Sequence, residues 1–297
     1  MKLFKKPNQE TIERRFRRKE HYLLSKRRFV IDNFFSSDFN KPSNIDLITV
    51  SFNNPIIIDY QIKLFKKFLK GNYCHIICDN SNKEERAKEI KEVCVKNNIT
   101  YIHCEPRKIP HGFADSHGIA LNWVYKEVVQ KRKNNFALLD HDMFPMKEFD
   151  IESYLENAEL AGRVDEISDI WYLWPGFSFF RYELLKNKRV NFRRHRKWYL
   201  FKVPRVDTGS ANWYPLYSKY DKKKVKKVAF YGWNIVDNKP VKKEEIKGKF
   251  IQEKMVDYSS DKIWFHSTCG SEWRDVKGKN QIIYKILNSV LSDSITK

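Results

Sequence analysis

Residues 136–145 read Phe136-Ala137-Leu138-Leu139-Asp140-His141-Asp142-Met143-Phe144-Pro145, a short apolar run that ends in two aspartates two positions apart. A run of this kind, bounded by polar residues, is typical of a buried strand. Side chains two positions apart on extended backbone point to the same side, so the carboxylates of Asp140 and Asp142 can turn toward one point. On the same alternation, His141 points away from it. Two hard oxygen donors beside open coordination positions suit Mg²⁺ or Mn²⁺ shared with a diphosphate.

Three units of strand followed by helix precede this stretch. Apolar runs predict strands at residues 46–52, 73–78 and 99–104, and helical spacing predicts helices at 59–69, after the capping-box pattern of Ser81 and Glu84, and around 120–128. Such alternation favours an α/β domain with a parallel sheet and helices on its faces. Ligands of these sheets bind beyond the carboxyl ends of the strands, where this chain has carboxylates and amides. The absence of a glycine-rich phosphate loop argues against a Rossmann dehydrogenase and a P-loop NTPase.

The chain after residue 160 is less regular. An aromatic strand runs from Trp171 to Phe180 and is interrupted by Pro175-Gly176. Further strands are predicted at residues 228–236 and 262–266. Apolar residues at helical spacing between 283 and 290 predict a closing amphipathic helix.

The composition is that of a folded protein. Of 297 residues, 41% are apolar and 15% aromatic, which excludes a disordered or collagen-like chain. No apolar run approaches the ~18 residues of a membrane span, and the start of the chain lacks the apolar stretch of a secretory signal, so we expect a cytoplasmic protein. The five cysteines are odd in number and show no Cys-x-x-Cys spacing, so we expect reduced core residues rather than disulfides or a zinc site.

The formal net charge of +20 is unevenly distributed. Residues 1–43 carry 12 basic against 5 acidic side chains and residues 161–297 carry 29 against 15, whereas residues 44–160 are nearly neutral with 16 against 17. The N-terminal excess falls on a predicted helix, Thr11 to Val30. This helix either lies on an anionic membrane surface or packs on the domain as a solvated helix. A second basic cluster, residues 186–205, is expected in a surface loop.

The segment Leu138 to Pro145 resembles the metal-binding Asp-x-Asp segment of nucleotide-sugar glycosyltransferases of the GT-A fold. An isolated Asp-x-Asp arises often by chance and also caps turns and helices, so the order and spacing of further segments supports the resemblance. These segments are Asp79-Asn80-Ser81, the stretch from His117 to Asn122, and Asp207-Thr208-Gly209. The resemblance covers roughly residues 45–270.

This resemblance implies a GT-A, Rossmann-like fold with a mostly parallel central sheet flanked by helices. It places a catalytic domain at residues 44–297, with a donor half at about 44–160 and an acceptor half at about 161–297. Residues 1–43 would form a basic helical extension.

The family resemblance also implies a nucleoside site at the ends of the first two strands. Three residues would contact the base and ribose: Ser51, Phe52 and Asn53. Asp79 would accept hydrogen bonds from the uracil or ribose of a donor that we expect to be UDP-linked. Asp79 alternatively serves only as a turn and helix-capping residue.

Further residues would contact the sugar, the diphosphate and the metal. His117 and Asn122 would lie near the sugar or diphosphate, unless His117 faces the core as a satisfied buried histidine. Asp140 and Asp142 would hold the metal, joined by a histidine late in the chain, for which His266 has the matching position. Imidazole suits Mn²⁺ better than Mg²⁺, so we expect Mn²⁺, with Mg²⁺ as the alternative. His266 could instead only pack on a neighbouring tryptophan.

The acceptor side follows from the same resemblance. Trp174 and Gly176 belong to a strand and loop that would border the acceptor, and aromatic faces suit stacking on sugar rings. Asp207 would bind the acceptor and deprotonate its attacking hydroxyl, as an inverting enzyme requires. No signature distinguishes an inverting from a retaining enzyme here.

The leading hypothesis is therefore a metal-dependent glycosyltransferase that acts on a glycan or lipid-linked acceptor. It could be brought to the inner face of a membrane by its basic segments. A sugar-phosphate nucleotidyltransferase would share the sheet and carboxylates, but it normally needs a glycine-rich loop after the first strand. A nucleic-acid-binding protein would explain the charge of +20, but the neutral central block argues against it.

Overall fold

The computed structural model describes residues 30–104, 113–167, 169–195, 207–236, 239–242, 255–268 and 279–292. The predicted basic helix at residues 11–30 lies outside the described residues, apart from Val30. So do Cys269 and residues 196–205 of the second basic cluster.

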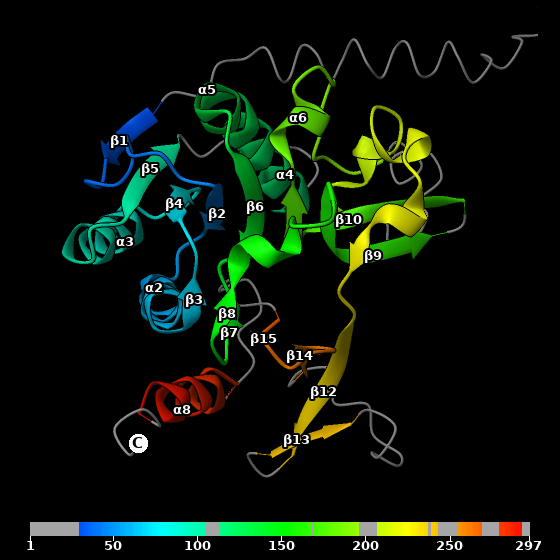
Figure 1. Cartoon of the computed structure of the whole chain (residues 1–297). Coiled ribbons are helices and arrows are strands. Elements are labelled where there is room, and N and C mark those ends of the chain that lie inside the picture. Colours follow the sequence, from blue (N-terminus) through cyan, green and yellow to red (C-terminus); the bar gives the residue numbers. More distant parts are fainter. Residues whose placement is uncertain are drawn as a thin grey trace, which may run out of the picture.

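An eight-stranded sheet forms the centre of the molecule, with the strand order β1-β5-β4-β2-β6-β10-β9-β11 (Figure 1). Its strands are β1 (Val30–Phe34), β2 (Ile45–Ser51), β4 (Tyr73–Asp79), β5 (Thr100–Cys104), β6 (Asn135–Asp140), β9 (Leu160–Ile167), β10 (Ile170–Phe180) and β11 (Lys226–Lys227). The four strands predicted before residue 141, namely β2, β4, β5 and β6, are parallel neighbours. The strands that flank them, β1 and β10, pair in antiparallel orientation. The predicted α/β class is confirmed.

The order of the parallel strands creates a switch point between β2 and β6. β2 pairs with β4 on one side and with β6 on the other. The strands β4 and β5 therefore extend the sheet to one side of β2, and β6 extends it to the other. Ser51 lies opposite Asp79 in one ladder, and Val50 lies opposite Asp140 in the other. Ligands of open α/β sheets bind at the carboxyl ends of the strands beside such a point.

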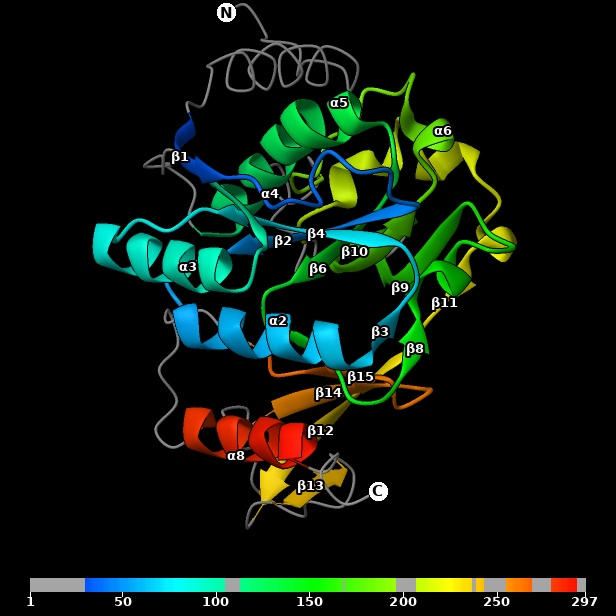
Figure 2. The same cartoon turned by 60° about the vertical axis from the view of Figure 1, so that its left-hand side comes forward.

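Helices cover both faces of the parallel strands (Figure 2). They are α2 (Pro55–Phe68) and α3 (Glu84–Lys96) on one face, and α4 (Phe113–Val124) on the other, where a π-helical turn (Tyr125–Val129) leads into α5 (Gln130–Arg132). Both faces of strand β6 are apolar because each face packs against a different hydrophobic cluster. Phe136 and Leu138 pack into the cluster that contains α4, whereas Ala137 and Leu139 face the opposite cluster with Phe65 of α2.

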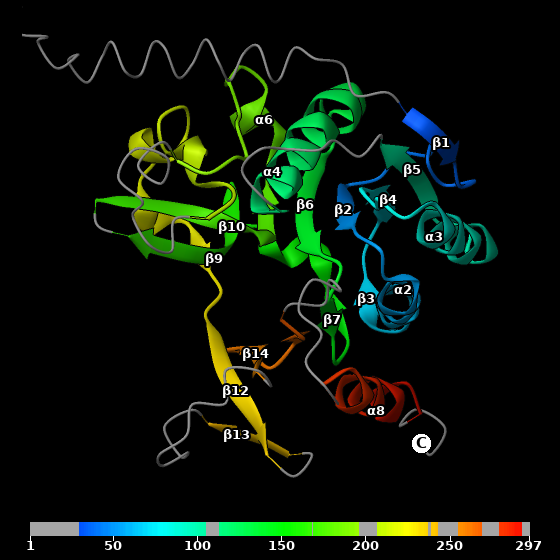
Figure 3. The ribbon, with the colours of Figure 1, turned by 180° about the vertical axis from the view of Figure 1, so that it is seen from behind.

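A second, five-stranded sheet has the order β13-β12-β14-β15-β7. Its strands are β7 (Met143–Pro145), β12 (Phe230–Val236), β13 (Lys239–Lys242), β14 (Met255–Ser259) and β15 (Trp264–His266). β7 follows β6 after a two-residue turn, His141-Asp142, so this turn joins the two sheets. The closing helix α8 (Lys279–Ser292) lies beside α2, where Tyr284 stacks on Tyr60 at 5.5 Å between ring centroids (Figure 3).

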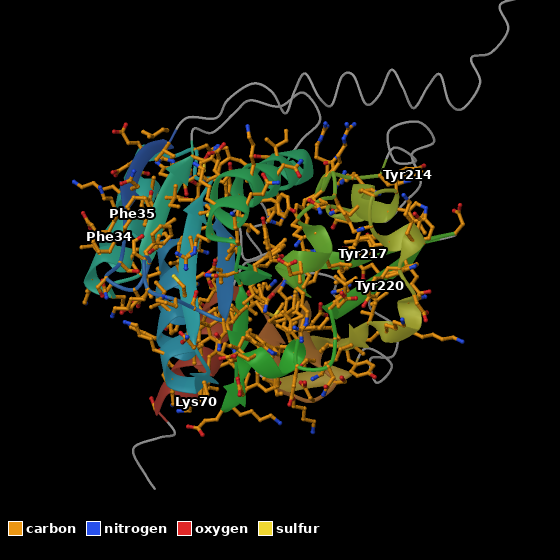
Figure 4. All side chains as sticks on the ribbon, turned by 45° about the horizontal axis from the view of Figure 1, so that its top comes forward. Phe34, Phe35, Lys70, Tyr214, Tyr217 and Tyr220 are labelled. Carbon is orange, nitrogen blue, oxygen red and sulfur yellow. The ribbon has the colours of Figure 1, made fainter. Side chains whose placement is uncertain are left out.

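The remaining elements are short. They are β3 (Leu69–Lys70), β8 (Phe149–Asp150), α6 (Tyr182–Leu185) and four 3₁₀ turns, Ile151–Tyr154, Ser210–Trp213, Tyr217–Lys219 and Lys222–Lys224. Figure 4 shows Tyr214, Tyr217 and Tyr220 at the side of the molecule opposite Phe34 and Phe35.

Two local predictions need correction. α3 does not begin with a capping box, because Lys83 occupies the N-cap position and the Ser81 hydroxyl donates instead to Asp79 at 2.6 Å. The Lys83 amide donates to the side-chain oxygen of Asn53 at 3.3 Å. The aromatic strand β10 is continuous rather than interrupted, since Pro175-Gly176 is accommodated as an irregularity of register between Leu173 and Ser178.

Three further features bear on the sequence predictions. β1 lies within the expected extension 1–43 and pairs with β5, so Val30–Phe34 belong to the central sheet. Four of the five cysteines are buried and form no disulfide, as expected: Cys74, Cys78, Cys94 and Cys104. In the described part of the chain, no helix combines the length and the apolar character needed to cross a membrane.

Candidate metal and donor site

The structure brings three predicted metal ligands together at the switch point. Asp140 ends β6, Asp142 lies in the turn after it, and His266 ends β15. Each of the three residues offers one ligand atom, and these three atoms all lie within 4.8 Å of one another. The His266 Nε2 atom is 3.3 Å from Oδ1 of Asp142. The antiparallel pairing of β15 with β7, which sets His266 opposite Met143, places the histidine beside the aspartates.

The donor set fits a divalent cation. Mg²⁺ binds oxygen at about 2.0–2.1 Å in an octahedron, so adjacent ligands are roughly 3 Å apart and opposite ones roughly 4.2 Å. The spacing between His266 and Asp142 matches adjacent positions on one ion. Two carboxylates and one imidazole form a set that suits Mn²⁺. These three residues would hold the ion and leave positions open for a diphosphate.

Burial perturbs the titration of this group. Burial and the adjacent Asp142 carboxylate raise the pKa of Asp140 to about 7. Burial disfavours the charged form of His266, but the Asp142 and Asp257 carboxylates outweigh that effect and raise its pKa to about 10. The carboxylates of Asp140 and Asp142 thus repel each other beside the imidazole of His266. A bound divalent ion would reduce the repulsion between the two carboxylates.

A second layer of side chains holds His266. Asp257 lies directly opposite His266 in the ladder of β14 and β15, with Oδ2 3.4 Å from Nδ1. Arg163 of β9 lies between two carboxylates, 3.6 Å from Asp257 and 3.0 Å from Asp165. A carboxylate on one imidazole nitrogen commonly orients the other toward a metal. The sequence prediction missed these residues, because only the strand register places Asp257 beside the histidine.

His117 of α4 lies beside the proposed metal ligand Asp140, and its predicted place near the sugar or diphosphate stays a prediction. Its Nε2 atom is 3.9 Å from Oδ1 of Asp140. Burial lowers the pKa of His117, although the Asp207 and Asp142 carboxylates oppose the shift. A neutral imidazole is therefore the prevailing form at neutral pH, and it can donate one hydrogen bond to a ligand without adding a charge.

Asp79 lies at the expected edge of the sheet but faces inward. Its carboxylate is fully buried and accepts hydrogen bonds from Ser51 Oγ at 2.9 Å, from the Ser81 amide and hydroxyl at 3.0 and 2.6 Å, and from the Tyr101 hydroxyl at 2.8 Å. These bonds fasten the loop after β4 to the end of β2. The predicted contact of Asp79 with the base or ribose stays a prediction.

The loop after β2 is built in the same way. Asn53 has a positive φ of 49° and is 3% exposed. Its backbone amide donates to the Ser81 hydroxyl at 2.8 Å, and its side chain bonds to Asn82 at 2.7 and 3.2 Å. Ser51 is fully buried and Phe52 is half-buried. Ser51 and Asn53 thus join the loop after β2 to the loop after β4, and their contact with a nucleoside stays a prediction.

Asn122 is engaged away from the carboxylates. Its amide nitrogen donates to Asn191 at 3.0 Å, and its oxygen accepts from the Phe192 amide at 2.7 Å. It therefore ties the segment after α6 to α4. A role near the sugar or diphosphate is not seen in this geometry and stays a prediction.

The expected acceptor residues border the metal ligands. A Cβ atom added to Gly176 would lie 2.6 Å from Oδ2 of Asp140, so this strand position contacts the carboxylate directly. The Trp174 ring lies 5.1 Å from the His266 ring and 4.9 Å from the Arg163 guanidinium. Gly209 has a φ of +89°, and a Cβ there would meet Pro175 at 2.7 Å, so glycine lets the 207–209 turn pack on β10.

Asp207 lies in this turn with a side chain that is 46% exposed. Its Oδ1 accepts from the Thr208 amide at 2.7 Å and lies 3.6 Å from Nε of Arg194. Its charge contributes to the raised pKa of Asp140, which places it in the field of the metal ligands. The carboxylate is thus near the site and open to a ligand.

No protein-family model and no curated protein matches the chain. Similar solved structures include the mannosyltransferase PcManGT from Pyrobaculum calidifontis in complex with GDP-Man and Mn²⁺, at 12% identity over 59% of this chain and 53% of that chain, with a TM-score of 0.33. The glycosyltransferase GlyE of Streptococcus pneumoniae TIGR4 shows 10% identity over 63% and 45% of the two chains (TM-score 0.37). The mannosyltransferase Ktr4p of S. cerevisiae shows 11% over 63% and 69% (TM-score 0.35). The match spans about half the length of the first two proteins.

Proposed function

We propose that the chain is a metal-dependent glycosyltransferase that moves a sugar from a nucleoside diphosphate to a glycan or lipid-linked acceptor. The observation that carries this proposal is the meeting of Asp140, Asp142 and His266 at the switch point of the sheet. These residues would hold Mn²⁺ or Mg²⁺, which neutralises the charge that develops on a departing diphosphate. His117 would donate a hydrogen bond to a diphosphate oxygen or a sugar hydroxyl.

The acceptor would approach from the side of β10 and the 207–209 turn. There Asp207 takes the proton of the acceptor hydroxyl while that oxygen attacks the anomeric carbon and the bond to the diphosphate breaks. Such a single displacement inverts the configuration at the anomeric carbon. The half-buried Trp174 offers an aromatic face for a sugar ring beside the metal ligands.

The structure favours this proposal over the two alternatives. The loop after β2 carries no glycine, and Asn54 there caps α2 by accepting from the Ile57 amide at 3.2 Å. A nucleotidyltransferase would use that position for a flexible phosphate loop. Carboxylates dominate the site itself, which disfavours a nucleic-acid backbone. They are Asp140, Asp142, Asp165, Asp207 and Asp257.

A donor screen tests the proposal. Purified protein is incubated with Mn²⁺ and a set of UDP- and GDP-linked sugars, and both hydrolysis and the shift in melting temperature are recorded. We expect one donor to stabilise the protein and to be hydrolysed only with the metal, and we expect UDP-linked donors to be preferred. Asp142→Asn should abolish turnover, while Asp59→Asn, the same charge change on α2, should not. Full activity of Asp142→Asn would refute the proposed site.

The net charge leads to a proposal about location. Residues 1–43 carry 12 basic and 5 acidic side chains, and an anionic membrane surface attracts such a segment. We expect the full chain to float with anionic liposomes at low salt and a chain lacking residues 1–29 to float less. Equal flotation of the two chains would exclude the N-terminal segment as the anchor.

A further inference from the structure

We propose that Gln61 of α2 is a positioning residue that sets the geometry of the metal-binding turn, and that Thr49 of β2 orients it. This inference rests on the proposed metal site at Asp140, Asp142 and His266. Neither Gln61 nor Thr49 would touch a metal or a substrate, and both would act through the backbone that carries the ligands.

A single amide nitrogen of Gln61 bridges both ends of the turn. Nε2 donates to the carbonyl oxygen of Asp140 at 2.8 Å and to that of Met143 at 3.1 Å. An amide nitrogen has two hydrogens, so each carbonyl can receive one of them. The peptide groups that follow Asp140 and Met143 are therefore tied to one nitrogen atom. The backbone of both aspartates lies within the segment that these two bonds hold.

Thr49 fixes which way the Gln61 amide faces. The Thr49 hydroxyl donates to Oε1 of Gln61 at 2.9 Å and lies 3.5 Å from Nε2 of His75. Rotating the amide by half a turn would set its oxygen against two carbonyl oxygens. Thr49 and Gln61 are both fully buried, so water cannot replace a lost partner.

A third bond secures the turn from the other sheet. The Ser267 amide donates to the carbonyl oxygen of Asp142 at 3.0 Å, and Ser267 directly follows His266. The aspartates are therefore tied to α2 through Gln61 and to the histidine through Ser267. Gln61 supplies the two bonds that reach the turn from α2, whereas Ser267 supplies the bond from the end of β15.

The sequence of α2 shows that packing alone does not require an amide here. Gln61 belongs to the buried face of the helix, whose other members are apolar: Pro55, Ile57, Ile58, Ile62, Leu64 and Phe65. A buried amide is costly unless its donors and acceptor are all satisfied. An apolar side chain of similar size would fill the space, so the amide indicates a directional role.

The test compares Mn²⁺ binding, measured by electron paramagnetic resonance, with the melting temperature of the metal-free protein. Gln61→Leu keeps the volume but removes both donors, and Thr49→Val removes the hydroxyl that orients the amide. We expect Gln61→Leu to weaken Mn²⁺ binding roughly 10- to 100-fold, as loss of a supporting partner does in other metal sites. Thr49→Val should shift it in the same direction by less.

Thr100→Val is the matched control. Thr100 is a fully buried threonine of β5 whose hydroxyl bonds with Ser36 at 2.9 Å. Its removal should lower the melting temperature without changing Mn²⁺ affinity. If Gln61→Leu and Thr49→Val lower the melting temperature but bind Mn²⁺ like the wild type, the inference is wrong. If Gln61→Leu does not fold, Thr49→Val decides by the same comparison. If the wild type itself binds no Mn²⁺, the proposed metal site fails, and this inference fails with it.

Discussion

Gly176 is the position where a single methyl group most directly displaces a proposed metal ligand. A Cβ there would lie 2.6 Å from Oδ2 of Asp140 and 2.2 Å from the Trp174 ring, whereas ordinary contacts begin at 3.4 Å. The carboxylate would have to retreat by about 0.8 Å, the difference between these distances, and the ring by more. The ring cannot move freely, because His266 and Arg163 lie against it. Gly176→Ala should therefore displace at least one metal ligand.

A misplacement of about 1 Å can cost an enzyme on the order of 100-fold in rate. We expect Gly176→Ala to lose that much donor turnover and to bind Mn²⁺ more weakly, with a smaller effect on the melting temperature. Ser178→Ala is the control on the same strand, since the Ser178 hydroxyl has no hydrogen-bond partner within the described residues. Wild-type turnover and Mn²⁺ affinity in Gly176→Ala would refute the contact between β10 and the metal site.

Three further variants separate the roles of nearby residues. Asp207→Asn should lower transfer by roughly 10²- to 10⁴-fold, as loss of a general base does, while donor affinity measured by calorimetry stays constant; equal loss of donor affinity would contradict the role. Asp257→Asn should weaken Mn²⁺ binding roughly 10- to 100-fold through a misoriented His266, and unchanged binding would remove Asp257 from the site. Arg132→Leu breaks a pair with Asp46 whose side chains are 11% and 1% exposed, so urea titration should show a loss of about 3–5 kcal/mol in unfolding free energy; a loss below about 1 kcal/mol would show a pair no stronger than a surface one.

The parallel core of the fold was predictable because its strands are short, largely apolar runs buried on both faces. β2 shows the principle, since its seven residues are all buried. The second sheet was predictable only in part, because apolar runs indicated β12 and β15 but not how they pair. β7 has three residues, and only its long-range pairing with β15 makes it a strand. The Ser81 capping box failed for a related reason, because the Ser81 hydroxyl bonds to Asp79 and to the amide of Asn53, a residue distant in sequence.

The site shows the same division between local and long-range information. The local spacing of Asp140 and Asp142 predicted two converging carboxylates, and the family resemblance placed His266 with them. Nothing in the local sequence indicates that Asp257 lies opposite His266 or that Gln61 reaches the turn, because both contacts depend on strand register and helix placement. Sequence spacing alone also did not predict that the Asp79 carboxylate accepts four hydrogen bonds from protein groups.

The most direct test of the central claim is the affinity of the protein for Mn²⁺ with and without a nucleoside diphosphate. If Asp140, Asp142 and His266 share the ion with a diphosphate, each ligand strengthens the binding of the other by the same factor. We predict one Mn²⁺ per chain, bound more tightly when the diphosphate is present, and loss of this binding in Asp142→Asn. Mn²⁺ binding that is absent, or that is the same in Asp142→Asn and in the wild type, would contradict the account.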